Sequence, residues 1–240
     1  NNFRLQDLWI NDAPLLDKGV STLPPVPSIE TTLRANPDGG FSIATYDGSG
    51  SAAQIAHGLG TKPDMVIVKS RNGTQNWAVQ TKASGPTEYL YLNESNESRS
   101  DSGTAFWNDT APTAQVVTVG SDNDTNASNQ EYVAYSFASV PGVSAIGEYT
   151  GSGSTSGPII SCGFRPKFLM VKRTNATGWW EIWDGARDTH NPRETWLAAN
   201  VPNAEYTSGP TADRIEFLNN GFRLISNSAD VNTNGGEYLY

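Results

Sequence analysis

The sequence has few of the residues that build disulfides or metal sites. Cys162 is its single cysteine, so an internal disulfide and a thiolate metal site are excluded. Two histidines, His57 and His190, are too few for an imidazole cluster within one chain. We therefore expect no metal site and no cofactor. Because Cys162 lies within an apolar run, we expect it to be a small buried side chain.

An excess of basic residues and long apolar runs are also lacking. The chain has 16 Lys and Arg against 25 Asp and Glu, for a net charge of −9. Nucleic-acid binding needs a basic face that releases counterions, so no nucleic-acid partner is predicted. No stretch approaches the roughly 18 apolar residues that span a bilayer, and no signal-peptide pattern is visible. Membrane insertion is therefore not predicted.

What the sequence does contain is short apolar runs separated by turn residues. Its 23 glycines and 14 prolines argue against long helices, and a hydrophobic content of 37% suits thin β-sandwiches with one wet face per sheet. The runs Met65–Lys69 and Phe168–Lys172 are apolar on both faces, so we expect them to be central strands covered by a second sheet. The pattern predicts an all-β fold of β-sandwiches.

A set of landmarks recurs in the same order along the chain. The matched pairs are Tyr46–Ser51 with Tyr149–Ser154, His57–Pro63 with Cys162–Pro166, Met65–Lys69 with Phe168–Lys172, Trp77–Val79 with Trp180–Ile182, Tyr89–Asn93 with Trp196–Asn200, Asp124–Asn126 with Asp230–Asn232, and Glu131–Tyr135 with Glu237–Tyr240. Their nearly constant spacing predicts a tandem duplication, with one module at 41–141 and another at 142–240.

The segment 1–40 has a different character and is predicted to be an extended N-terminal arm. Asp7–Ile10 could form one short strand, and Leu23–Pro27 reads as a stiff, polyproline-like linker. At the other end, the second copy stops at Tyr240, whereas the first continues through Ser136–Val140. This difference predicts a longer polypeptide or a last strand completed by another chain.

Two motifs in the repeat favour turns over ligand sites. The Tyr-x-Gly-Ser-Gly-Ser openings lack the strand, helix and lysine of a phosphate-binding loop. Asp122, Asp124 and Asn126 resemble the first half of a calcium loop, but Ala127 stands where that loop needs glycine, and Val133 where it needs glutamate. An Asx-type turn explains what the two copies share.

The candidate binding residues are an aromatic cluster and a polar loop in the second copy. Trp179 and Trp180 must point to opposite faces of a strand, so one is expected at the surface or an interface. In the loop, glycoside hydrolysis would need two carboxylates about 5–9 Å apart, which adjacency does not establish, and no serine-nucleophile elbow is present. We expect an Arg187–carboxylate pair that fixes the loop. The candidates are Trp179, Trp180, Trp183, Asp184, Arg187, Asp188 and His190.

The blocks Phe41–Tyr46 and His57–Lys69 resemble a repeat found in structural proteins of tailed bacteriophages, of the aquatic and cyanophage type. The blocks Phe106–Thr113 and Trp183–Asp188 are similar to the same family, so the resemblance covers about 41–240. The second copy departs from it, with Cys162–Arg165 in place of His-Gly-Leu-Gly. The resemblance implies a lectin-like sandwich of the jelly-roll or concanavalin-like type, a place on the virion surface, and no catalytic residues.

These observations predict a virion structural protein, a tail fibre or surface appendage that acts in host adhesion and assembly and is not an enzyme. Its predicted partners are other virion proteins, further copies of the chain in a homo-oligomer, and a host-surface glycan. The alternatives are a capsid-decorating or head-fibre protein and a secreted carbohydrate-binding module. A depolymerase is a third class.

Overall fold

The computed structural model describes residues 9–10, 13–14, 26–101, 103–207 and 214–240. Within these residues the regular structure is β-strand, apart from one 3-10 turn, η2 (Pro37–Gly39). Every strand pair described is antiparallel, including the short pair β1 (Trp9–Ile10) and β2 (Ala13–Pro14). The prediction of an all-β fold is confirmed.

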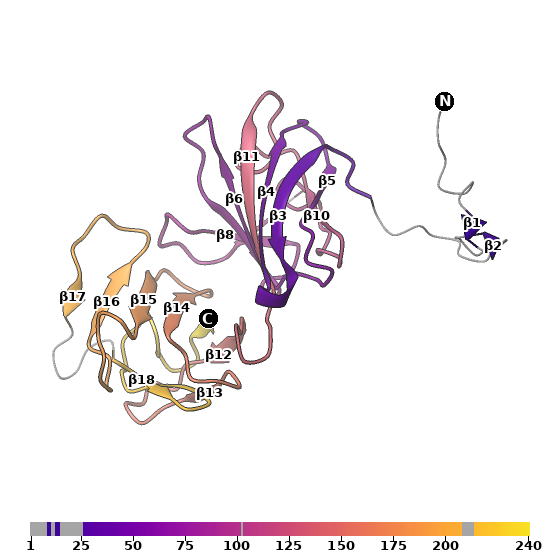
Figure 1. Ribbon diagram of the computed structural model, residues 1–240. Helices are drawn as coiled ribbons and strands as arrows, with labels where there is room; N and C mark the ends of the chain where they lie inside the picture. Colours follow the sequence, from indigo (N-terminus) through magenta and orange to yellow (C-terminus); the bar gives the residue numbers. More distant parts are fainter. Residues whose placement is uncertain (1–8, 11–12, 15–25, 102, 208–213) are drawn as a thin grey trace.

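The first half of the chain forms a seven-stranded sheet and a two-stranded sheet (Figure 1). The large sheet contains, in spatial order, β3 (Thr31–Asn36), β4 (Phe41–Asp47), β11 (Glu131–Phe137), β6 (Met65–Ser70), β7 (Ala78–Thr81), β8 (Glu88–Tyr91) and β9 (Arg99–Ser100). The small sheet pairs β10 (Val116–Val119) with β5 (Ala53–Ala56).

The second half forms a six-stranded sheet and a three-stranded sheet. The large sheet contains β12 (Glu148–Thr150), β20 (Glu237–Leu239), β14 (Phe168–Arg173), β15 (Trp180–Asp184), β16 (Thr195–Ala198) and β17 (Tyr206–Thr207); the small one contains β13 (Ile159–Ser161), β19 (Gly221–Leu224) and β18 (Ile215–Leu218). The spatial order β12-β20-β14-β15-β16-β17 repeats that of β4-β11-β6-β7-β8-β9, landmark by landmark.

Each large sheet packs its inner face against the small sheet of the same half. Strand β4 alternates buried and accessible residues, as expected for a strand with one core face. In the first half, Tyr46 and Val66 of the large sheet meet Ile55 and Val117 of the small one in one buried cluster. In the second half, Val171 and Trp183 meet Phe222 and Ile215 in the same way. Both halves are therefore sandwich-like.

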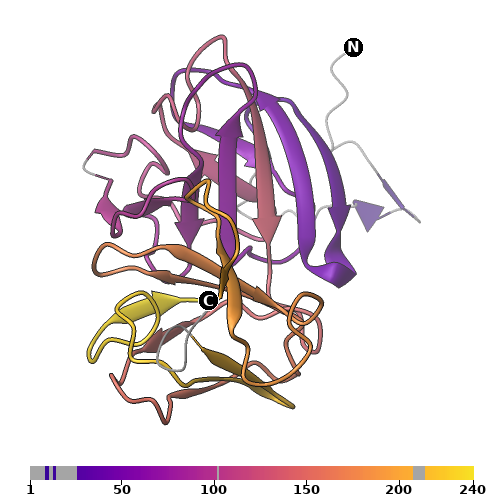
Figure 2. The ribbon, with the colours of Figure 1, turned by 90° about the vertical axis from the view of Figure 1, so that its left-hand side faces the viewer.

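A third buried cluster lies between the two halves, where the outer faces of the two large sheets meet. It contains Met65 and Ile67 of β6, Val79 of β7, Leu90 of β8, Trp180 of β15 and Leu239 of β20. In Figure 2 the orange strands of the six-stranded sheet lie below the purple and pink strands of the seven-stranded sheet. This contact, called the junction below, explains why β6 is apolar on both faces. The small sheet covers one face of β6, and the second half of the chain covers the other.

Residues 31–36, which the sequence assigns to the arm, form a strand of the first large sheet. Strand β3 pairs with β4 over its whole length, from Thr31↔Tyr46 to Asn36↔Phe41. The turn between them depends on Gly40, whose φ is +64° and where a Cβ would lie 2.3 Å from the carbonyl oxygen of Ala138. Of the remaining predicted arm, Asp7–Leu8 and most of the Leu23–Pro27 linker fall outside the described residues.

Candidate functional site

The tryptophan pair at the start of β15 divides between two cores. Trp180 is 1% exposed and lies in the junction, where its Nε1 donates a hydrogen bond to the carbonyl oxygen of Tyr91 at 2.9 Å. Trp179 points to the opposite face, as strand alternation predicts. It is half-buried against Trp196 and Tyr206, with ring centroids 5.7 and 5.4 Å away. The predicted interface tryptophan is Trp180, and the interface is inside the chain.

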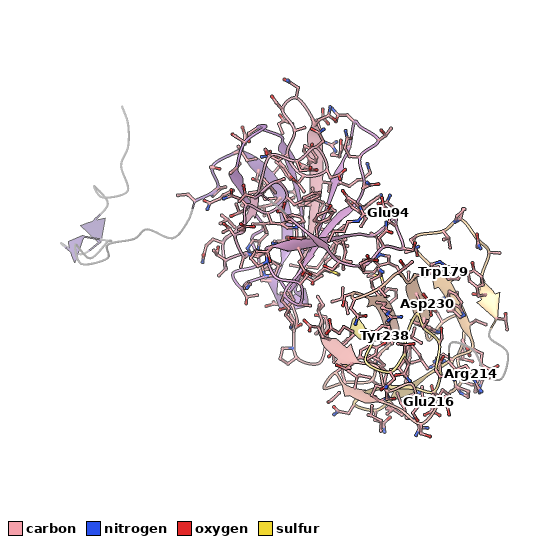
Figure 3. All side chains as sticks on the ribbon, turned by 180° about the vertical axis from the view of Figure 1, so that it is seen from behind. Glu94, Trp179, Arg214, Glu216, Asp230 and Tyr238 are labelled. Carbon is pink, nitrogen blue, oxygen red and sulfur yellow. The ribbon has the colours of Figure 1, made fainter. Side chains whose placement is uncertain are left out.

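Burial removes two of the three predicted aromatic contacts from the surface. Trp183 is 0% exposed in the core of the second half, and Trp180 is enclosed by the junction. Neither ring can meet a receptor while the chain stays folded. Trp179 keeps part of its surface accessible beside Asp230, whose Oδ1 accepts from the Trp179 backbone N at 2.9 Å (Figure 3).

The polar loop after β15 is held by a carboxylate–guanidinium network. Arg187 Nε donates to Asp184 Oδ2 and Arg187 Nη1 to Glu205 Oε2, both at 2.6 Å. Asp184 Oδ1 accepts from the backbone N of Ala186 and of Arg187. The hydrogen bond from the Arg187 backbone, together with the guanidinium, lowers the pKa of Asp184. The expectation of an Arg187–carboxylate pair that fixes this loop is confirmed.

The last two candidate residues of the loop differ in their surroundings. Asp188 Oδ2 accepts from the backbone N of Glu194 at 2.6 Å, so its carboxylate closes the loop onto β16. His190 is exposed, with Nδ1 2.9 Å from Thr189 Oγ1. The structure therefore uses Asp184, Arg187 and Asp188 to shape the loop. It leaves His190 exposed and Trp179 partly accessible.

Asn126 ties the glycine-rich opening of the first half to the segment that resembles a calcium loop. Its Oδ1 accepts from the Ser49 backbone N at 2.9 Å, and its Nδ2 donates to the carbonyls of Ser51 and Gly120, each at 2.7 Å. Asp122 Oδ1 accepts from the Asp124 backbone N, which is the predicted Asx turn. The carboxylate of Asp124 accepts from the Asn76 backbone N and the Tyr91 hydroxyl. These polar atoms all make hydrogen bonds within the chain and stabilise its turns.

The second half repeats this arrangement around Asn232. Its Oδ1 accepts from the Ser152 backbone N at 2.8 Å, and its Nδ2 donates to the carbonyls of Ser154, Gly157 and Ser226. In both halves a stacked tyrosine pair lies next to the asparagine, Tyr46–Tyr132 and Tyr149–Tyr238. We call each arrangement the asparagine knot. Among the described residues there is no group of three or more His, Cys, Asp and Glu that could hold a metal ion.

The junction also contains a buried cation, Lys172, which is not among the functional residues predicted from the sequence. Lys172 is 0% exposed, and its Nζ donates to three carbonyl oxygens, those of Arg173 at 2.7 Å, Gly178 at 3.0 Å and Ser95 at 3.1 Å. The bond to Ser95 crosses from the second half to the first. Burial lowers the pKa of Lys172 to about 8, and the carboxylates of Asp230 and Glu97 partly offset this effect.

We expect this lysine to make the protein more stable as the pH rises above 8. Its folded pKa lies below the unfolded value of about 10.4, so the unfolded chain binds more protons between these values. The free energy of unfolding should rise by about 1.4 kcal/mol per pH unit between about pH 8 and 10. Urea unfolding at several pH values would measure this slope against Lys172→Met. An equal slope in the variant would contradict the assignment.

A cleft of about 670 Å³ opens beside the junction, between the turn at 142–146 and the loop before β14. Its lining is mainly apolar and includes Val143 and Phe168, which are 57% and 59% exposed. Cys162, expected to be buried, is half-buried and lines this cleft. Phe168 was expected inside a covered strand. It is accessible because the junction does not extend to the start of β14.

Comparison with protein families gives one match. The model of a family described as a domain of unknown function, DUF7483, matches residues 20–240. The chain belongs to the DUF7483 family. No curated protein and no solved structure matches the sequence. In the described part of the chain, no helix has the length and apolar character needed to cross a bilayer.

In this DUF7483 chain, one sequence signal indicates the buried charge of the junction. The Val-Lys ends of Met65–Lys69 and Phe168–Lys172 place a lysine inside two apolar strands. Lys69 stays half-buried and donates to the carbonyl of Gly73, whereas Lys172 is enclosed by the junction. A lysine in an apolar central strand was therefore the available sign of a buried charge.

Proposed function

We propose that the chain is a non-catalytic structural and binding protein made of two tandem copies of one jelly-roll-type sandwich module. The support is the equal strand order of the two large sheets and the recurrence of the asparagine knot at Asn126 and Asn232. Similar local composition in the two halves would not by itself produce the same buried hydrogen bonds between distant segments. Two such knots, at matching positions, are what duplication of a folded unit would leave.

The junction is the observation that carries the functional proposal. Trp180, Lys172 and the buried apolar cluster join the modules into one body, where a flexible linker would leave them independent. A rigid pair of sandwiches suits a protein that bears mechanical load or that presents a binding surface. Together with the phage-repeat resemblance of Phe41–Lys69, it favours a surface appendage of a tailed phage that acts in adhesion and assembly. Other virion proteins and further copies of this chain are the proposed partners.

Particle labelling tests this assignment directly. An antibody raised against the purified chain should label the exterior of virions of the phage that encodes it, at the tail or on an appendage. Virions incubated with the same antibody after absorption on the pure chain provide the control. Label spread over the head would favour the capsid-decoration alternative. Recovery of the chain only in the soluble fraction of infected cells, with unlabelled virions, would contradict the proposal.

A further inference from the structure

The first half contains a buried amide whose hydrogen-bonding atoms have no partner. Gln80 lies on β7 and is 2% exposed, and neither its Oε1 nor its Nε2 makes a hydrogen bond. Ala78, two residues earlier, belongs to the inner core, so Gln80 also points between the two sheets. An amide left in this state destabilises a fold, because water would have satisfied its two donor hydrogens and its acceptor oxygen.

Gln80 lies at a pocket of about 170 Å³ at one end of the first sandwich. Its apolar wall includes Val66 and Ala111 and the rings of three prolines, Pro63, Pro86 and Pro112. Charged residues also line it. Lys82 and Asp64 pair at 3.2 Å, and Lys62 is exposed beside them. Apolar walls with a few convergent polar groups are the usual composition of a small-molecule site.

The second half has a different side chain at the position equivalent to Gln80. Gln80 is the register partner of Val66 in the β6–β7 ladder, and Trp183 is the register partner of Leu169 in the equivalent β14–β15 ladder. Trp183 is 0% exposed and fills the core at that position. The first half has a smaller, polar side chain where the second has an indole. The side chain at this core position therefore differs between the two halves. This difference points to the first half, whereas the prediction placed recognition in the second copy.

We propose that this pocket binds one neutral pyranose unit of a surface glycan. The primary amide is enclosed in the free chain, and turning it toward the pocket would offer a donor and an acceptor side by side to two neighbouring sugar hydroxyls. The C–H faces of a sugar ring match the proline and alanine walls. The choice of a glycan rests on the adhesion role proposed above, whereas the pocket and its unpartnered amide are independent of that role. Gln80 is thus the residue that orients the ligand.

Titration of the ¹⁵N-labelled full chain tests this proposal. The methyl glycosides of glucose, mannose, galactose and N-acetylglucosamine serve as probes, each raised to about 50 mM. At least one should shift the Gln80 side-chain amide signals and the backbone amides of Lys82 and Gly85 saturably, with a Kd of about 1–10 mM, the range of a small single-unit site. Gln80→Met keeps the length of the side chain and removes its polar atoms, so the variant should bind at least tenfold more weakly.

The matched control is Gln115→Met, the same chemical change on an exposed side chain. It should leave the titration unchanged. Gln80→Met should also raise the unfolding midpoint, since the orphaned amide is replaced by an apolar group of similar shape. Absence of a saturable shift with all four glycosides would overturn the proposal and identify the amide as a buried polar group without a ligand. Equal binding by Gln80→Met, or shifts mapping away from the pocket, would also overturn it. Virion labelling is independent of each result.

Discussion

Replacing Trp180 with alanine is expected to lower the free energy of unfolding by about 3–5 kcal/mol, the range found for large aromatic side chains in cores. The side chain is 1% exposed, contacts the outer face of the first large sheet, and donates to the carbonyl of Tyr91. Its removal would leave a cavity in the junction and take one of its hydrogen bonds from the Tyr91 carbonyl, which also accepts from the Glu94 backbone N. The two halves should then unfold in separate transitions, because the junction couples them.

Denaturant unfolding followed by circular dichroism and by differential calorimetry would measure both effects. The repeat supplies a matched control, Trp77→Ala. Trp77 stands at the equivalent position of the first half, where its backbone N donates to Asn93 as that of Trp180 does to Asn200. Trp77 is only half-buried, so its replacement should cost clearly less and preserve a single transition. Because Trp77 also packs at the border of the junction, equal losses for the two variants would show that Trp180 is not its main anchor.

Asn232→Asp should be destabilising by about 3 kcal/mol at neutral pH, because it preserves shape but exchanges a donor for a negative acceptor. The new oxygen would face the carbonyls of Ser154, Gly157 and Ser226, which now accept from Asn232 Nδ2. A protonated carboxyl can donate to one of them, so the folded-state pKa of the new Asp should be raised. The penalty should therefore shrink as the pH falls.

Equilibrium unfolding at pH 7 and at about pH 4.5 measures both the loss and its pH dependence. Asn126→Asp should behave alike in the first half, since its Nδ2 donates to Ser51 and Gly120. Asn129→Asp is the control, an exposed residue of the same loop. A loss at Asn232 no larger than at Asn129 would mean that the asparagine knot is not a stabilising element.

The periodicity of the sequence was sufficient to predict most of the strands. It also predicted that Trp179 and Trp180 point to opposite faces. It was also sufficient to identify β6 as central, but not what covers each face. A strand that is apolar on both sides looks the same whether a second sheet or a second copy covers it. Strand β3 was missed because Thr31–Asn36 is mostly polar. Of its side chains only Leu33 packs against the core, and the ladder with β4 holds the rest of the strand.

The candidate site was harder to predict because its atoms are shared between distant segments. The sequence marked Asp184 and Arg187 correctly as a local pair, since their partners lie in one loop. It marked Asn126 as part of a turn but not its partner Ser49, which lies far along the chain, and it did not mark the orphaned amide of Gln80. Both features depend on which atoms surround the side chain in the folded protein, and for Gln80 on the lack of a hydrogen-bond partner. Only the comparison of Gln80 with Trp183 in the folded repeat makes that visible.

The junction has a consequence for assembly. The two halves bury different parts of their outer faces: Val79 and Leu90 of the first half lie in the junction, whereas their equivalents in the second half, Ile182 and Leu197, are not part of this cluster. A contact between non-matching surfaces is heterologous, and symmetry does not close it after two members. The junction by itself therefore does not limit an assembly of such units to a pair.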